Sequence, residues 1–222
     1  MLFVLLWSTG YIGAKYGLPY AEPFTLLFLR FVLALLLLVP LVMWFRPAMA
    51  MSRRERGHLM VSGLLLHGVY LGGVFAAIKL GLSAGLTALI VGAQPLLTSL
   101  AAPLLFGERP SPLHWLGIGL GFCGIYLILG AAPSVSYTLP ALLAAVAALF
   151  GITAGTLYQK RFCTRHDLLA VTVHQYLPTV ALFGVCALLL ETREIDWTLQ
   201  FVAALLWLVM ALSLGAILLL TW

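Results

Sequence analysis

Charged residues are scarce in this sequence. Its 222 residues include only 12 Lys and Arg and 7 Asp and Glu, so that 9% are charged, whereas 63% are hydrophobic. Soluble domains are about 25% charged and about 45–50% apolar, so the composition excludes an ordinary water-soluble globule. It also excludes intrinsic disorder, which requires low hydrophobicity and high charge. We therefore expect a membrane protein.

Acidic residues are missing from the interior of the apolar stretches, because all seven lie at the ends of stretches or between them. A membrane-embedded carboxylate is the usual anchor for a cationic drug and for the proton exchanged against it, so this absence argues against proton-coupled export of lipophilic cations. Cysteine is rare as well, and the three cysteines have no metal-ligand spacing. The segment 119–124 matches the GxGxxG pattern, but it lies in an apolar stretch without the strand that dinucleotide binding requires. We expect no metal and no cofactor.

Apolar stretches of helical length are what the sequence has in abundance. A helix that crosses a membrane needs about 20 apolar residues, and no strand-like alternation runs through these stretches. We therefore expect an all-α membrane protein with about eight transmembrane helices, at about 2–18, 23–44, 58–80, 82–106, 112–131, 139–160, 168–190 and 198–222. Ser52 and Glu55 form a capping box before the third stretch.

Lysine and arginine are unevenly distributed over the loops. Eight of them follow the second, fourth and sixth stretches, and three lie on the opposite side. The positive-inside rule then places the eight in the cytoplasm, together with the N-terminus of a multi-pass protein. The lipid bilayer is the expected partner. Nucleic-acid binding is not expected, because the basic clusters are short and lack interleaved aromatic residues.

Two parts of the chain resemble each other when the sequence is shifted by 145 residues. The matching polar and glycine residues are Ser8 with Thr153, Gly10 with Gly155, Lys15 with Lys160, Glu22 with Asp167, and Arg30 with Gln175. Because five stretches separate the two units, the second unit would cross the bilayer in the opposite direction, as in secondary transporters with inverted repeats. We expect a first five-helix repeat at 1–131 and an incomplete second repeat of three helices at 132–222. A complete second repeat would continue for about 54 residues beyond Trp222.

Several motifs resemble those of one family. The residues that carry the resemblance are Trp7-Ser8-Thr9-Gly10, Arg30, Gln94-Pro95, Gln175 and, most specifically, LLFGERPSPLHWLGIGLGFCGIYL at 104–127. In these the chain resembles the EamA-type family of the drug/metabolite transporter superfamily. The resemblance implies a ten-helix fold of two inverted five-helix halves. It also implies export or exchange of small metabolites across the inner membrane of bacteria.

Arg30 is the most informative polar residue. It lies seven residues beyond Pro23, about 10 Å into the bilayer at 1.5 Å per residue. Placing an arginine at the bilayer centre costs about 2.5–3.5 kcal/mol on insertion scales. The side chain could extend to the outer interface, bind backbone carbonyls, act as a gate, or bind an anionic or zwitterionic substrate. The lack of an acid within the membrane favours a substrate carboxylate.

Other candidates for the substrate pathway are polar or aromatic residues on shared helix faces or at mid-membrane depth. They are Trp7, Ser8, Tyr11 and Lys15 in the first stretch, His67 and Tyr70 in the third, Gln94 and Thr98 in the fourth, Thr153 and Thr156 in the sixth, and His174 and Gln175 in the seventh. Pro95 frees the carbonyl of Val91, which predicts a kink beside Gln94. Packing or hydrogen bonding within the protein stays an alternative for each.

These observations favour a secondary transporter that exports or exchanges small polar metabolites, amino-acid-like or otherwise anionic or zwitterionic, by alternating access. Its partners would be a small-molecule substrate and a coupling ion, for which the proton is one candidate; the sequence does not indicate an oligomeric state. One alternative is a non-transporting membrane subunit or remnant. Another is an intramembrane lipid-modifying enzyme with His67 or His174 as base, but no nucleophile or acidic partner lies at their depth. We therefore do not expect an enzyme.

Overall fold

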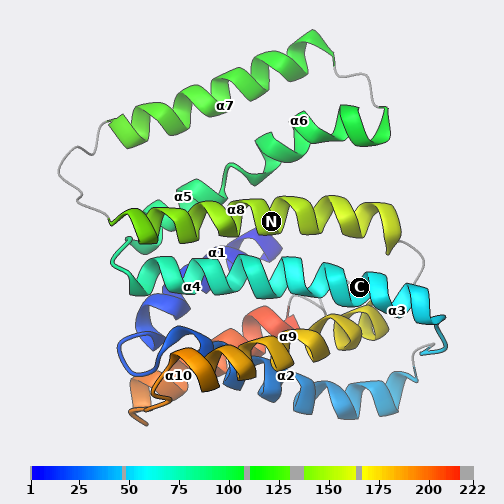
Figure 1. Cartoon of the computed structure of the whole chain (residues 1–222), viewed down its shortest axis with the longest axis vertical. Helices are drawn as coiled ribbons and strands as arrows, with labels where there is room; N and C mark the ends of the chain where they lie inside the picture. The colour runs from blue at the N-terminus through cyan, green and yellow to red at the C-terminus, as the bar shows by residue number, and fades with distance from the viewer. Residues whose placement is uncertain (1, 47–48, 108–110, 131–137, 164–166, 216–222) are drawn as a thin grey trace.

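The computed structural model describes residues 2–46, 49–107, 111–130, 138–163 and 167–215 (Figure 1). Within these residues the chain is helical, and an isolated bridge between Ala21 and Ile195 takes the place of a sheet. The helices are α1 (Leu2–Gly17), α2 (Pro23–Phe45), α3 (Arg53–Gly63), η1 (Leu64–Val69), α4 (Tyr70–Lys79), α5 (Ala84–Val91), α6 (Gln94–Phe106), α7 (Pro112–Gly130), α8 (Leu139–Phe162), α9 (Leu168–Leu190), α10 (Leu199–Trp207) and η2 (Leu208–Gly215). The prediction of an all-α protein is confirmed.

Five helices of the described part are long and apolar enough to cross a membrane. They cover Pro23–Phe45, Arg53–Lys79, Ala84–Phe106, Leu139–Phe162 and Leu168–Leu190, and a shorter apolar helix covers Leu199–Ser213. The protein is therefore a multi-pass membrane protein. The total of eight spans and the ten-helix arrangement stay predictions.

Local sequence signals determine where several helices begin and break. Ser52 Oγ accepts a hydrogen bond from the Glu55 amide at 3.2 Å, and the Glu55 carboxylate accepts one from the Ser52 amide at 2.8 Å. This capping box, predicted from the sequence, starts α3 several residues before the apolar stretch begins. The kink predicted at Pro95 is also present, because α5 ends at Val91 and α6 begins at Gln94.

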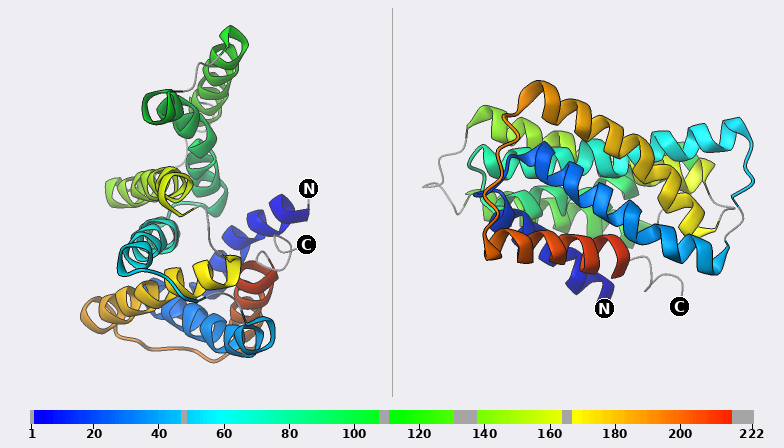
Figure 2. Two further views of the ribbon diagram at one scale, coloured as in Figure 1. Left: turned by 90° about the vertical axis from the view of Figure 1, so that its right-hand side faces the viewer. Right: turned by 90° about the horizontal axis from the view of Figure 1, so that it is seen from below.

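The bundle is built from pairs of helices that are distant in sequence. α2 packs along α9, α1 packs along α10, and the continuous helix α3–η1–α4 packs along α8 (Figures 1 and 2). α2 and α9 run in opposite directions, since Glu191 at the end of α9 binds the first turn of α2. The centre of the bundle is filled by large side chains with at most 1% of their surface exposed: Leu26, Leu27, Phe31, Phe75, Phe183 and Phe201.

Small residues bring α4 and η1 into close contact with α8. A Cβ atom added at Gly73 would lie 2.6 Å from the Ala144 carbonyl oxygen, and one added at Gly151 would lie 2.9 Å from the Tyr70 amide nitrogen. In lipid, close backbone packing is a main source of helix association, because lipid tails are as apolar as the side chains. The glycines therefore stabilise this helix pair.

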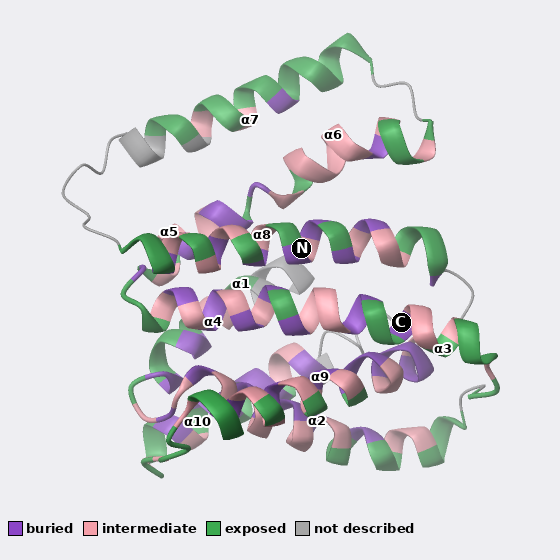
Figure 3. Ribbon diagram, in the orientation of Figure 1, coloured by how far each residue is buried: buried purple, intermediate pink, exposed green. Residues whose placement is uncertain are grey.

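α6 and α7 extend away from the rest of the bundle (Figures 1 and 2). α7 packs against α6, where a Cβ atom at Gly121 would meet the Leu96 side chain at 2.7 Å. Most described side chains of α7 are exposed (Figure 3), with 76% of Leu113 and 64% of Leu120 uncovered. These apolar side chains suit contact with lipid.

Two π-helical turns interrupt the helices at corresponding positions. η1 covers Leu64–Val69, and a shift of 145 residues places it within η2, Leu208–Gly215. π-helical turns are rare and occur frequently at functional sites. Both turns contribute side chains to the cavity described next.

Candidate functional site

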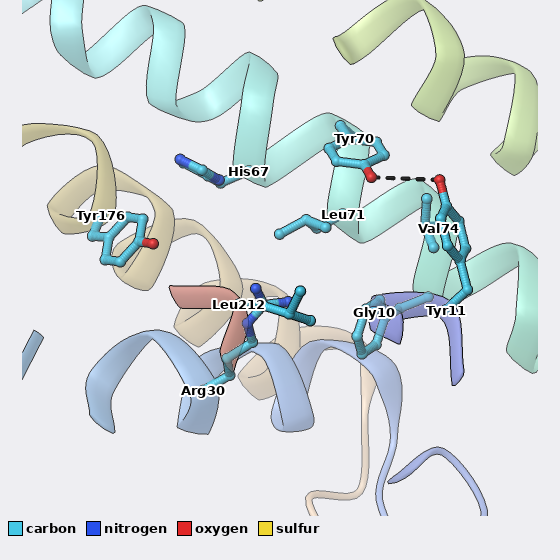
Figure 4. Close-up of a pocket in the computed structure, with 10 residues that line it drawn as sticks. Gly10, Tyr11, Arg30, His67, Tyr70, Leu71, Val74, Tyr176 and Leu212 are labelled. Atoms are coloured by element: carbon cyan, nitrogen blue, oxygen red, sulfur yellow. Dashed lines mark hydrogen bonds between the residues drawn. The ribbon is translucent and has the colours of Figure 1, made fainter. Parts of the chain in front are cut away.

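A cavity near the middle of the bundle collects polar and aromatic side chains (Figure 4). Its walls come from α1, α2, η1, α4, α9 and η2, through Gly10, Tyr11, Arg30, His67, Tyr70, Leu71, Val74, Phe75, Tyr176 and Leu212. The cavity volume is about 60 Å³, whereas pockets that hold drug-sized ligands measure about 300–1,000 Å³. A drug-sized ligand could enter only if the surrounding helices moved apart.

Arg30 places a positive charge in this cavity. The side chain is only 6% exposed, and its Nε donates a hydrogen bond to Ser213 Oγ at 3.2 Å. The Tyr176 hydroxyl donates to the carbonyl of the same serine at 3.4 Å. Ser213 is neutral, so it holds the guanidinium without compensating its charge.

Aromatic rings surround the charge. The His67 ring in the cavity wall lies 5.1 Å, edge on, from the Tyr176 ring, and the Phe31 ring packs 5.5 Å from His67 and 5.4 Å from the Arg30 guanidinium. The hydroxyls of Tyr11 and Tyr70 lie 3.5 Å apart and connect α1 to α4 (Figure 4). A cation, hydroxyl groups and ring faces together suit a small molecule that carries a carboxylate and a less polar part.

Four residues predicted for the substrate pathway meet in this cavity: Tyr11, Arg30, His67 and Tyr70. They come from three apolar stretches, and the packing of these helices against one another brings the four side chains together. The structure adds Tyr176 and Ser213, which we did not predict. Tyr176 directly follows His174 and Gln175, so counting mid-membrane tyrosines as polar would have found it.

Most of the other predicted candidates lie outside the cavity and bind their own helices. The bonds are Thr153 Oγ1 to the Leu149 carbonyl (2.7 Å), Thr156 Oγ1 to the Ile152 carbonyl (2.7 Å), His174 Nδ1 with the Ala170 carbonyl (2.8 Å), and Gln94 Nε2 to Thr98 Oγ1 (3.1 Å). Ser8 and Lys15 are exposed. The Trp7 side chain lies outside the described atoms. Gln175 does not line the cavity and binds Ser62 and Gln159 in a polar cluster beside it.

Two carboxylates join α2 to the end of α9. Glu191 accepts hydrogen bonds from the amides of Phe24 and Thr25, both at 2.7 Å. In return, Glu22 accepts bonds from the Thr192 amide at 2.6 Å, the Thr192 hydroxyl at 2.9 Å and the Arg193 amide at 3.3 Å. Desolvation alone would raise the pKa of Glu22, but the donors of Thr192 and Arg193 lower the pKa below its ordinary value.

Within the described residues, no group of three or more His, Cys, Asp and Glu side chains could hold a metal ion. The described lining of the cavity contains one cation, Arg30, and no carboxylate. The arrangement can bind and orient a small anion or zwitterion.

Comparison with known proteins agrees with the sequence resemblance. Residues 1–130 match the EamA-like transporter family. A protein of Salmonella typhimurium (strain LT2) named "Probable amino-acid metabolite efflux pump" is 26% identical over 199 residues, which are 87% of this chain and 64% of that protein. The chain thus spans less than two thirds of that relative's length.

Two further matches cover nearly the whole chain. The Bacillus subtilis (strain 168) protein named "Uncharacterized transporter YvbV" is 27% identical over 96% of this chain and 70% of its own length. A solved crystal structure with 25% sequence identity superposes with a TM-score of 0.69 over 97% of this chain and 76% of that one. The family match covers more than half of the chain and confirms the predicted resemblance. The protein belongs to the EamA-like transporter family, which is a family of membrane transporters and not of enzymes.

Proposed function

We propose that the protein is a secondary transporter that exports or exchanges small, amino-acid-like metabolites by alternating access, and that the cavity at Arg30 is its substrate site. The observation that carries this proposal is the 6% exposed guanidinium in a cavity otherwise lined by neutral groups. The name of the Salmonella typhimurium relative, an amino-acid metabolite efflux pump, supports the same substrate class.

Chemistry favours a carboxylate as the group that Arg30 binds. The planar guanidinium matches a carboxylate with two parallel N–H···O bonds, and such charge-assisted bonds are about twice as strong as neutral ones. A substrate carboxylate would also compensate a charge whose cost in the bilayer is about 2.5–3.5 kcal/mol. The hydroxyls of Tyr11 and Tyr70 would then bind an amino or hydroxyl group of the substrate.

The helix pairs support two inverted repeats at 1–131 and 132–222. Under the 145-residue shift, α1 corresponds to the second half of α8, and α3–η1–α4 corresponds to α10–η2. The contact of α1 with α10 is therefore the counterpart of the contact of α8 with α3–η1–α4, and both contacts are present. Inverted repeats of this kind commonly hold their substrate between the two units, near the middle of the bilayer.

Alternating access would follow from motion of one unit against the other. The cavity of about 60 Å³ is smaller than the pockets that usually hold small-molecule ligands, so we expect the helices to separate during loading. We place the N-terminus and the arginine-rich loop at 46–56 in the cytoplasm, and the protein in the inner membrane, on the basis of the positive-inside rule.

A transport assay with substrates of different charge tests this function. Proteoliposomes would be loaded with a radiolabelled neutral amino acid, and exchange against external amino acid would be compared with that of a lipophilic cation. We expect amino-acid exchange in the wild type and its loss in Arg30→Gln, with cation transport unaffected or increased. Arg54→Gln, an exposed variant in the first turn of α3, is the matched control. Equal loss of both activities in Arg30→Gln, or no exchange by the wild type, would contradict the proposal.

A further inference from the structure

Gln175 lies in a polar cluster between α3, α8 and α9, where its side chain also contacts the cavity residue His67. Its Nε2 atom donates to Ser62 Oγ at 2.9 Å and lies 3.2 Å from Gln159 Oε1. Gln175 is 5% exposed and Ser62 is fully buried. We call Ser62, Gln159 and Gln175 the latch.

Backbone packing reinforces the latch. A Cβ atom at Gly63 would lie 2.5 Å from the Gln175 carbonyl oxygen, so α3 and α9 touch through their main chains at this point. One turn further along α9, Thr179 Oγ1 donates to the Gly63 carbonyl at 3.4 Å. α3 and α9 therefore leave no passage between them at the level of the latch.

The latch lies between the cavity and the end of the bundle that carries the basic loops. Ser62 follows the arginine-rich start of α3 by about two and a half turns, whereas the cavity residues occur later in the same continuous helix, from His67 to Phe75. Gln159 lies near the end of α8, beside Lys160 and Arg161. A solute that moves from the cavity to this end between α3, α8 and α9 would pass the latch.

The bond between Gln175 and Ser62 corresponds to the bond between Arg30 and Ser213 at the cavity. The 145-residue shift pairs Gln175 with Arg30. Arg30 binds Ser213 of η2, and Gln175 binds Ser62 of α3, so each residue joins the second helix of one proposed repeat to the third helix of the other. The first bond faces an open cavity, while the second is sealed within packed helices.

We propose that the latch closes the substrate path at the basic-loop end, and that its bonds break when the cavity opens toward that end. The inference rests on the proposed transport function, because a closure has meaning only for a path. In the alternate state Gln175 takes the place that Arg30 has here and lines the newly opened cavity.

Cys163 offers a native reporter of this closure. It is 7% exposed, packs with Leu59 and Val171 at the junction of α3, α8 and α9, and its Sγ lies 3.9 Å from Ser62 Oγ. Separation of α3 from α8 and α9 would expose the thiol. Replacing Cys123 and Cys186 with alanine leaves Cys163 as the single reactive cysteine.

The test measures the rate at which a membrane-permeant maleimide labels Cys163 in proteoliposomes without substrate. Interhelical hydrogen bonds in membranes contribute about 0.6 kcal/mol on average, so each lost bond should increase the open population about threefold. We expect about threefold faster labelling in Gln159→Leu and a larger increase in Gln175→Leu. Gln94→Leu is the matched control, because Gln94 binds Thr98 within its own helix.

The result is independent of transport. Unchanged labelling in both Gln159→Leu and Gln175→Leu would overturn the latch and leave the proposed function intact, as would an equal increase in Gln94→Leu. Faster labelling of the latch variants, together with a wild type that exchanges no amino acid, would support the closure and count against the proposed function. Gln159→Leu loses a single bond at the edge of the cluster, so it serves as the test if Gln175→Leu does not fold.

Discussion

The Arg30 guanidinium and the Ser213 hydroxyl connect α2 to η2 across the edge of the cavity, 3.2 Å apart. A charged group is thus held deep in the bundle by a neutral hydroxyl. Such a bond fixes the position of the guanidinium and leaves its charge available to a ligand. Ser213 therefore positions the guanidinium, whereas compensation of its charge is left to a ligand.

Ser213→Ala should weaken the fold and preserve ligand recognition. Loss of the Nε bond is expected to lower the free energy of unfolding by about 0.6 kcal/mol, the average for an interhelical hydrogen bond in a membrane protein. Carboxylate binding should persist, because the guanidinium remains. Unfolding in mixed detergent micelles, combined with equilibrium binding of an amino acid, checks both parts. Complete loss of binding in a folded variant would show that Ser213 is part of the recognition itself.

Arg30→Lys tests whether the shape of the cation matters as well as its charge. Lysine keeps the positive charge but cannot form two parallel bonds to a carboxylate. We expect amino-acid affinity to fall about tenfold, between the wild type and Arg30→Gln, in a binding titration. An affinity equal to that of the wild type would indicate that a point charge is sufficient.

Gly63→Ala should separate α3 from α9. The added methyl group would lie 2.5 Å from the Gln175 carbonyl oxygen, and overpacking of this kind typically costs about 1–3 kcal/mol. Gly117→Ala in α7 is the matched control, because a Cβ atom there meets nothing within 4 Å and alanine favours a helix over glycine by about 1 kcal/mol. Melting temperatures in detergent should therefore fall for Gly63→Ala and stay level or rise for Gly117→Ala. The same direction of change in both variants would contradict the close contact.

The Glu22 carboxylate should make stability depend on pH. Because its hydrogen bonds lower the pKa in the folded state, its stabilising contribution is present above the pKa of the unfolded chain and is lost as the pH falls through the folded pKa. Melting curves of the wild type between about pH 7 and pH 3 should show this loss at the acidic end, and Glu22→Gln should show less of it. Glu194→Gln, an exposed variant in the segment after α9 whose Thr192 and Arg193 bind Glu22, serves as the control. Identical pH profiles for the wild type and Glu22→Gln would rule out the effect.

Local rules explain what the sequence predicts well. The capping box of Ser52 and Glu55 and the break before Gln94 depend on residues within one helical turn of each other. The membrane class follows from composition alone. Arg30 and His67, chosen for their depth along a helix, both line the cavity, because polar side chains near mid-membrane tend to face the interior of a bundle.

The sequence does not specify which hydrogen-bond partner each polar side chain takes. Thr153 and Thr156 stay candidates for the substrate pathway, and in this structure each hydroxyl binds the carbonyl four residues earlier in its own helix. Gln175 binds Ser62, more than 100 positions away in the sequence, because α9 crosses α3 there. A crossing of this kind depends on how distant helices pack, which helix-by-helix patterns do not specify.

Recognition of a carboxylate by Arg30 is the central claim, and a comparison of matched ligands tests it most directly. The measurement is the thermal stabilisation of the purified protein by a neutral amino acid and by its carboxamide, which differ in the charge of one group. We expect the amino acid to stabilise the wild type more than the carboxamide does, and we expect this preference to disappear in Arg30→Gln. Equal stabilisation of the wild type by both ligands, or an unchanged preference in Arg30→Gln, would contradict the assignment of the site.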